Sequence, residues 1–180
     1  VACGEAVVVL PSERASRVAR IVTADGDLDE AVAGQAVTLT LEDEIDVGRG
    51  DVLASAAAPP GVTDQFAAHV VWMHEHALMP GRAYVVKIGA RSVPAAITDL
   101  KHKINVNTME HVAAKTLELN EVGVCNLALD HPVAFDAYGD DRTTGGFILI
   151  DRVTNATVGC GMIDFGLRRA TNLVWLEIET

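Results

Sequence analysis

The sequence predicts an all-β protein that consists of two small antiparallel barrels, and three observations lead to this prediction. Short segments rich in β-branched residues recur along the chain, turn residues separate them, and helical periodicity is scarce. Short strands at such regular spacing are typical of antiparallel barrels and sandwiches. With 180 residues, 49% of them hydrophobic and 22% charged, the chain is long and apolar enough to bury a core.

The first part of the chain holds several strand-like segments bounded by turn residues. The expected strands are Glu5–Leu10, Ala15–Thr23, Ala36–Leu41 and the end of Gly48–Ala54. In the second of these, alternation places Val18 and Ile21 near one face and the arginines mostly on the other. The acidic run Asp25–Glu30 is expected to form a surface loop, because its charges cannot be buried.

A linker is expected at Ser55–Gly61, with the sequence SAAAPPG, since two consecutive prolines cannot continue a sheet. We therefore divide the chain into a partial barrel over residues 1–58, a second barrel over 63–165 and a C-terminal tail over 166–180.

The sequence of the second part of the chain, after the linker, again predicts strands joined by tight turns. The expected strands are Gln65–Met73, Ala83–Ile88, Ser92–Val106 and residues 124–134, 146–151 and 157–163. Pro94 indicates an edge position or a bulge, since proline cannot donate to a ladder. Asn107–Thr116 has helical character and is expected to be a surface excursion with a turn or two of helix. Near the C-terminus, Trp175 and Leu176 predict that the tail packs against the protein.

Charge and cysteine content limit the function classes. Fourteen basic against 25 acidic residues give a net charge of −11, which disfavours binding to a nucleic-acid backbone. Two locally basic groups are expected to be solvated strand faces: they comprise Arg14, Arg17 and Arg20, and Lys101, His102 and Lys103. The cysteines Cys3, Cys125 and Cys160 are odd in number and lack CxxC spacing, which favours reduced thiols in a cytoplasmic protein. No apolar run approaches the roughly 18 residues of a membrane span.

Several motifs suggest chemistry, but the interpretation as ordinary structure is stronger for each. His74 and His76, beside His69, could bind zinc, yet a structural zinc site needs four ligands, and a hydrated loop is expected instead. The sequence of Asp164–Gly166 is DFG, which matches the magnesium-binding motif of kinases. The other kinase motifs do not accompany it, so a chance match is expected. Asp136–Gly139 spells the DxxG of GTPases without a phosphate-binding loop and is expected to be a turn.

The remaining candidates are also architectural. Cys125 and Cys160 lie in apolar strands without a nearby imidazole, so both are expected to pack as small hydrophobic residues. Asn155 is expected in a hairpin turn. Four glycines are expected at barrel corners, namely Gly145, Gly146, Gly159 and Gly161. The sequence therefore predicts no catalytic, cofactor-binding or metal-binding residue.

Particular segments nevertheless resemble a known family. Similarity to the second domain of translational-GTPase-like proteins is found in GEAVVVLPS at Gly4–Ser12, in AGQAVTLTLED and in VGRGDVLA. Similarity to the third domain of these proteins is found in LDHPVAFD at Leu129–Asp136 and in GGFILIDRVTNATVGCGMI. Within that class, the segments match the sulfate adenylyltransferase subunit 1 family best. The resemblance covers essentially the whole chain, and TNATVG and LTLEDEIDVGRGDVLA are its most specific parts.

This resemblance implies barrels of the elongation factor Tu domain 2 and domain 3 type, the first incomplete at its N-terminus. It implies a role in sulfate activation, in which GTP hydrolysis drives formation of adenylyl sulfate from ATP and sulfate. GTP and Mg²⁺ would bind to a GTPase domain missing from this chain, and ATP to a catalytic partner subunit. An adenylyl-sulfate kinase domain follows in some relatives. Glu13 replaces a common glycine, and Gly146 a usual alanine.

Two alternatives remain open at this point. An elongation-factor-type barrel pair would bind RNA or the ribosome, against which the net charge and the 4% aromatic content count. A stand-alone β-module would have a metal site at His74 and His76.

Overall fold

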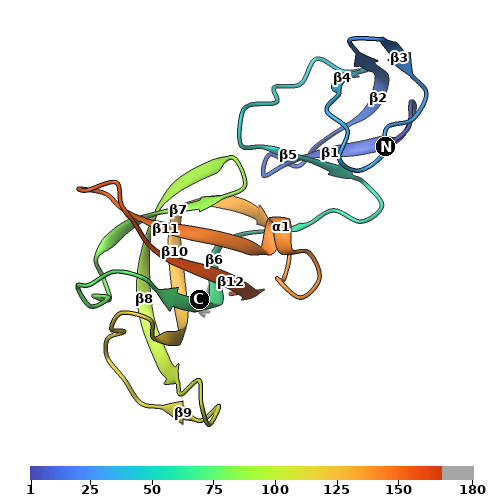
Figure 1. The fold of residues 1–180 in the computed structure, drawn as a ribbon. Coiled ribbons are helices and arrows are strands. Elements are labelled where there is room, and N and C mark those ends of the chain that lie inside the picture. Colours follow the sequence, from blue (N-terminus) through green and yellow to red (C-terminus); the bar gives the residue numbers. More distant parts are fainter. Residues whose placement is uncertain (168–180) are drawn as a thin grey trace, which may run out of the picture.

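The structure, a computed structural model, describes residues 1–167 and consists of two all-β bodies at opposite ends (Figure 1). This confirms the predicted fold class. The expected packing of Trp175 and Leu176 lies outside the described residues. Of the described helices, none is long and apolar enough to cross a membrane.

The first body is a half-barrel of five antiparallel strands. They are β1 (Ala6–Leu10), β2 (Arg14–Thr23), β3 (Gly26–Leu28), β4 (Thr38–Leu41) and β5 (Val52–Ser55). The order is β3-β2-β1-β5, and β4 also pairs with β2. Its buried core is small and contains Val7, Val18, Ile21 and Ala31. Leu39, Leu41 and Leu53 pack against this core but stay partly exposed, as expected of a barrel that is incomplete.

Two local features of the half-barrel bear on the sequence predictions. The prediction that Asp25–Glu30 forms only a loop was wrong, because Gly26–Leu28 pairs with β2 and Leu28 packs on the core. A single apolar residue among acidic ones is enough to hold this short hairpin strand. Glu13 has a φ of 58°, a left-handed conformation that glycine adopts at less cost, which explains why glycine suits this turn.

The second body is a closed barrel. Its strands are β6 (Gly61–Trp72), β7 (Ala83–Ile88), β8 (Arg91–Ile104), β10 (Val122–Phe135), β11 (Gly146–Asp151) and β12 (Thr157–Gly166), with β9 (His111–Val112) beside β8 and one short helix, α1 (Arg142–Gly145). The order is β10-β6-β12-β11-β7-β8, and pairing of β10 with β8 closes the ring. All of these pairings are antiparallel.

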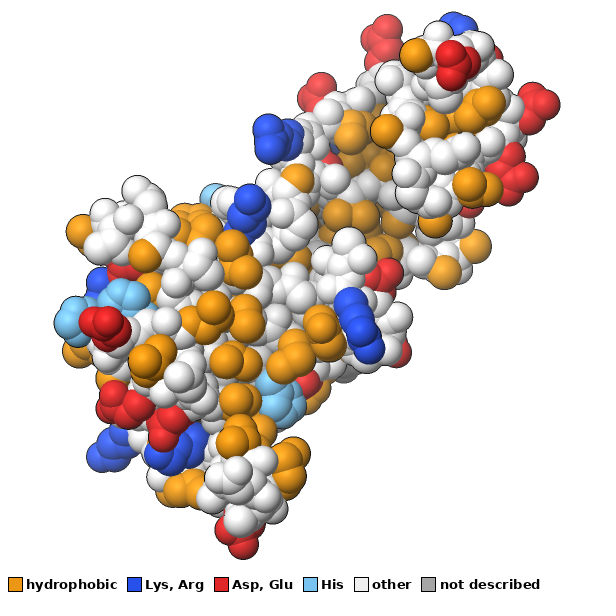
Figure 2. All heavy atoms as spheres, in the orientation of Figure 1, with side chains coloured by type: hydrophobic (Ala, Val, Ile, Leu, Met, Phe, Trp, Pro, Cys, Tyr) orange, Lys and Arg blue, Asp and Glu red, His pale blue; other side chains and the backbone are white. Residues whose placement is uncertain are grey.

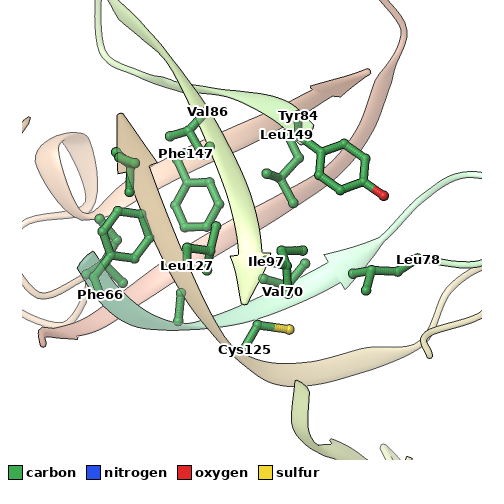
Figure 3. Packing of buried hydrophobic residues seen from close by; sticks show 14 of the residues in the cluster. Phe66, Val70, Leu78, Tyr84, Val86, Ile97, Cys125, Leu127, Phe147 and Leu149 are labelled. Atoms are coloured by element: carbon green, nitrogen blue, oxygen red, sulfur yellow. The ribbon is translucent and has the colours of Figure 1, made fainter. Parts of the chain in front are cut away.

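The interior of the closed barrel is filled by aliphatic and aromatic side chains from every strand of the ring (Figure 3). The rings of Phe66 and Phe147 lie 5.3 Å apart between centroids, and those of Trp72 and Tyr84 5.8 Å. Since such ring pairs stabilise beyond their buried area, this core holds the barrel as one body.

Two predictions for the second barrel were wrong in detail. Asn107–Thr116 contains no helix: Asn105 accepts the N–H groups of Asn107 and Thr108 in a turn, Met109 has a φ of 61°, and the chain then forms β9. The described helix lies elsewhere, at α1, where the Asp141 side chain accepts the N–H groups of Thr143 and Thr144. Such a four-residue helix has no hydrophobic period from which to predict it. In addition, β12 continues to Gly166, beyond the expected end at 163.

Pro94 lies where the sequence analysis expected it. It pairs with Val85 of β7, while the pairing of β8 with β10 begins only at Ala95. At this position β8 needs no hydrogen bond on its second side, so the missing N–H of proline is tolerated.

Gly161 is required by a close approach inside the barrel. It lies opposite Phe147 in the register of β11 and β12, and an added Cβ would come within 2.1 Å of the Phe147 ring. Phe147 is only 4% exposed, so its ring has little room to move. A side chain here would have to displace core atoms.

Replacing Gly161 by alanine is therefore expected to lower the free energy of unfolding by about 1–3 kcal/mol through overpacking. Urea unfolding followed by fluorescence measures this change. Gly139→Ala is the matched control, because nothing lies within 4 Å of a Cβ added there. Equal stabilities of the two variants would contradict the argument.

Candidate functional surfaces

The three histidines considered for zinc have other contacts. On β6, His69 lies with its Nδ1 atom 2.8 Å from Oδ1 of Asp164. The rings of His74 and His76 are 5.2 Å apart between centroids, and the N–H of His76 donates to Nδ1 of His74. Within residues 1–167, no group of three or more His, Cys, Asp or Glu side chains is placed to hold a metal ion.

The DFG and DxxG sequences are parts of ordinary structure. Asp164 of the DFG sequence is on β12, where it contacts His69, and Phe165 is exposed. Asp136 of the DxxG sequence follows β10, and its carboxylate accepts the Thr144 hydroxyl at 2.5 Å. These contacts tie both carboxylates to their own barrel.

Cys125 is fully buried in the core (Figure 3), and burial followed by the charge of Asp99 raises the pKa of its thiol to about 12. A thiol with so high a pKa is not a nucleophile near neutral pH. Cys160 is half-buried and Cys3 exposed, and all three are free thiols.

A cavity of about 180 Å³ lies between the two bodies. Its lining includes Val52 of the half-barrel, Ile88 and Val133 of the closed barrel, and the ion pair of Asp51 with Arg91. Nη1 of Arg91 lies 3.0 Å from Oδ1 of Asp51, and both side chains are mostly buried. This ion pair joins the two barrels beside the linker.

A smaller cavity of about 70 Å³ in the closed barrel is lined by Trp72, Tyr84, Arg82 and Asp151 among others. Asp151 is only 5% exposed and accepts the N–H groups of Val153 and Thr154, while Arg82 donates to its other oxygen. The N–H groups, foremost that of Thr154, and then the Arg82 charge hold the pKa of Asp151 below its usual 3.8. Asp151 thus ties the β11–β12 turn to the barrel.

Three of the six residues in the basic groups noted in the sequence form ion pairs. Arg20 forms an ion pair with Asp27, Lys101 with Asp99, and Lys103 with Glu121. Sequence reasoning missed two other cations, Lys87 and Arg142, which line an open cavity of about 300 Å³ with Gly89, Phe147 and Ile148. Neither forms an ion pair within the described part of the chain. No sequence signal brings them together, since they come from β7 and α1.

Comparison with known proteins agrees with this architecture. Residues 65–164 match the family described as "GTP-eEF1A C-terminal domain-like". The chain therefore belongs to the GTP-eEF1A C-terminal domain-like family.

Curated relatives resemble nearly the whole chain. Over 99% of its length it is 56% identical to the "Bifunctional enzyme NodQ" of Rhizobium sp. (strain N33), and over 98% it is 54% identical to the "Bifunctional enzyme CysN/CysC" of Xylella fastidiosa. It is 52% identical over 91% of its length to "Sulfate adenylyltransferase subunit 1" of Aeromonas hydrophila. The chain spans only 28% of the first two relatives and 34% of the third.

Among solved structures, Sup35 in complex with GDP superposes with a TM-score of 0.83 over 93% of this chain and 42% of the Sup35 chain. At 22% sequence identity this likeness concerns the fold alone.

The Asp151 carboxylate predicts a specific response to acid. Because its pKa is lowered in the folded protein, its stabilising contribution is present above pH 3.8 and is lost as the pH falls through the lower folded value. Asp151→Asn is expected to lower the urea midpoint at pH 7 and to flatten its fall between pH 4 and pH 3. Asp130→Asn, at an exposed position, is the control. If both variants respond to pH alike, the assignment fails.

A second prediction concerns the ion pair between the barrels. A double-mutant cycle with Asp51→Asn and Arg91→Met is expected to give a coupling energy of about 1 kcal/mol, and both single variants should speed proteolytic cleavage within residues 56–60. The control cycle uses Arg20 and Asp27, whose side chains are 61% and 48% exposed and whose coupling should be smaller. Zero coupling between Asp51 and Arg91 would show that this pair does not hold the barrels together.

Proposed function

We propose that this chain is the barrel pair of the GTPase subunit of a sulfate adenylyltransferase, the enzyme that forms adenylyl sulfate and pyrophosphate from ATP and sulfate. The observation that carries the proposal is the 52–56% identity to NodQ, CysN/CysC and sulfate adenylyltransferase subunit 1 proteins over 91–99% of the chain. The matched residues extend over both barrels.

The role proposed for the chain is mechanical. GTP and Mg²⁺ would bind to a GTPase domain outside these 180 residues, and ATP to a catalytic partner subunit. The chain itself has no phosphate-binding loop, and its DxxG aspartate, Asp136, is engaged with Thr144. A closed barrel with a continuous core moves as one body, which suits a part that transmits the nucleotide state of one domain to another protein.

An RNA-binding role has less physical support. Residues 1–60 carry four arginines and eleven acidic side chains, and the net charge of the whole chain is −11. A surface of this kind repels a phosphate backbone.

The proposal is tested with the full-length protein that carries this chain, co-expressed with the catalytic subunit from the same genome. We expect the two proteins to co-purify, and we expect adenylyl sulfate formation to be at least about tenfold faster with GTP than with GDP, a typical size for coupling between two sites. Pyrophosphate release coupled to adenylyl sulfate detection measures this rate.

Absence of both co-purification and GTP dependence would overturn the proposal. Tight, salt-sensitive retention of RNA in a filter-binding assay would instead support the elongation-factor-type alternative, because phosphate contacts weaken steeply with salt.

A further inference from the structure

Two histidine side chains are stacked where β9 meets the closed barrel. β9 pairs with β8 at two positions, Lys103 with Val112 and Ile104 with His111. His102 of β8 is therefore a diagonal neighbour of His111, and side chains at such positions on adjacent strands reach each other. The two imidazole rings lie 3.9 Å apart between centroids, with an angle of 18° between their planes. Two ionisable rings thus face each other across the ladder.

The stack joins a projecting segment to the barrel. This segment, which we call the β9 arm, comprises residues 105–112 and lies at the far end of β8 (Figure 1). Its other hydrogen bonds are local: the N–H of Asn105 donates to the Glu110 carbonyl, and that of Met109 to the Asn105 carbonyl. After the arm the chain returns to the core, because Ala114 packs against it and Leu117 is fully buried. The arm therefore depends on two ladder positions and the stack.

The surroundings of His102 favour its uncharged form. Its Nε2 atom is buried and has no hydrogen-bond partner within residues 1–167. A protonated imidazole carries an N–H at both nitrogens, so a proton at this atom would be buried without an acceptor. Burial, followed by the charges of His111 and His69, holds the pKa of His102 below its usual 6.5.

The nearest charged side chains of β8 and the arm are engaged elsewhere. On β8, Lys101 forms an ion pair with Asp99, and Lys103 forms one with Glu121. On the arm, the carboxylate of Glu110 accepts a hydroxyl within the same turn. These contacts leave the two lysines beside the stack and give neither ring a carboxylate.

The strands on the other side of β8 add a further imidazole. Val124 of β10 is matched to His102 on one side and to His69 of β6 on the other. The carboxylate of Asp164 contacts His69. Among the described residues, neither His102 nor His111 forms an ion pair. Two protonated rings in the stack would therefore repel each other without a compensating negative partner.

The arm carries apolar side chains whose position depends on the stack. Val106, Met109 and Val112 are exposed, and Figure 2 shows hydrophobic side chains at the end of the molecule where Figure 1 places β9. Val106 and Val112 also line a cavity of about 360 Å³ together with Ile104 and Glu121. Displacement of the arm would remove one wall of this cavity and change the surface at this end of the barrel.

We infer that the stack of His102 and His111 is an acid-sensitive latch: with both rings uncharged it holds the β9 arm against β8, and protonation of both rings releases the arm while the six-stranded ring stays closed. The latch depends on this chain alone, so it would operate whichever protein the barrels bind. Histidine is suited to this role because it changes charge within a few tenths to a unit of pH around its ordinary range.

The direction of the pH effect follows from the lowered pKa of His102. The contribution of the uncharged stack is fully present above pH 6.5 and is lost as the pH falls below 6.5 toward the folded value. The released population grows about tenfold for each pH unit over which the released arm binds one more proton than the docked arm.

The test measures hydrogen–deuterium exchange of the full-length protein at about pH 7 and about pH 5, expressed as protection relative to an unstructured peptide at the same pH. We expect the protection of residues 103–112 to fall at least about tenfold at the lower pH. Protection of β7, in the closed ring, should stay unchanged.

Substitutions at His111, which is exposed, separate charge from packing. His111→Phe keeps a ring for stacking but cannot take up a proton, so the fall in protection should disappear. His111→Lys carries a positive charge at both pH values, so the arm should already be poorly protected at about pH 7. His131→Phe, at an exposed position of β10, is the matched control and should behave like the wild-type protein.

Three outcomes would overturn the latch. The wild-type arm could keep its protection at both pH values, or the wild-type and His111→Phe proteins could lose protection alike. Loss of protection in all strands of the closed ring together would instead mean that acid unfolds the whole barrel. Thermal unfolding of each variant at about pH 7 checks that the barrel is intact.

Discussion

Closure of the second barrel is the constraint on which the rest of the structure depends. Strand β10 pairs with β6 along one edge and with β8 along the other, so the six-stranded ring has no free edge. Val124 shows the consequence at a single residue, because it is matched to His69 on one side and to His102 on the other. Once the ring is closed, a slip of one residue in any ladder would turn core side chains outward all along that strand. Closure therefore fixes which residues of each strand face the core and which face outward.

The same constraint explains the glycines of the barrel. A six-stranded ring encloses little space, so large side chains fit only where the strand opposite has none. Phe147 lies over Gly161, and Leu100 and Leu117 occupy the space over Gly123, where an added Cβ would come within 2.8 Å of both leucines. These contacts account for glycine inside strands, where its backbone freedom would otherwise cost stability.

The sequence predicted the parts of this structure that local patterns encode. The expected bounds of β7 and β11 agree with the structure, because clear turn residues end each run and β-branched and aromatic residues fill it. The failures occurred where long-range contacts decide. Gly26–Leu28 is a strand only because β2 offers a partner, and β9 only because β8 does. Lys87 and Arg142 illustrate the same limit at the candidate surface, since 55 positions separate them in the numbering and one cavity joins them.

The outward apolar residues of β11 also escaped the sequence analysis, and the reason lies in how hydrophobic runs are interpreted. In a run such as FILI of β11, both Leu149 and Ile148 are apolar, which reads as a strand buried on both sides. The barrel buries Leu149 inside and leaves Ile148 half-exposed, so inner packing alone gives no reason for an apolar residue at the outer position. Such a face favours unwanted association unless a partner covers it or charge keeps copies apart. The half-barrel, with eleven acidic side chains against four arginines in residues 1–60, provides that repulsion between copies, which links the charge of one barrel to the outer surface of the other.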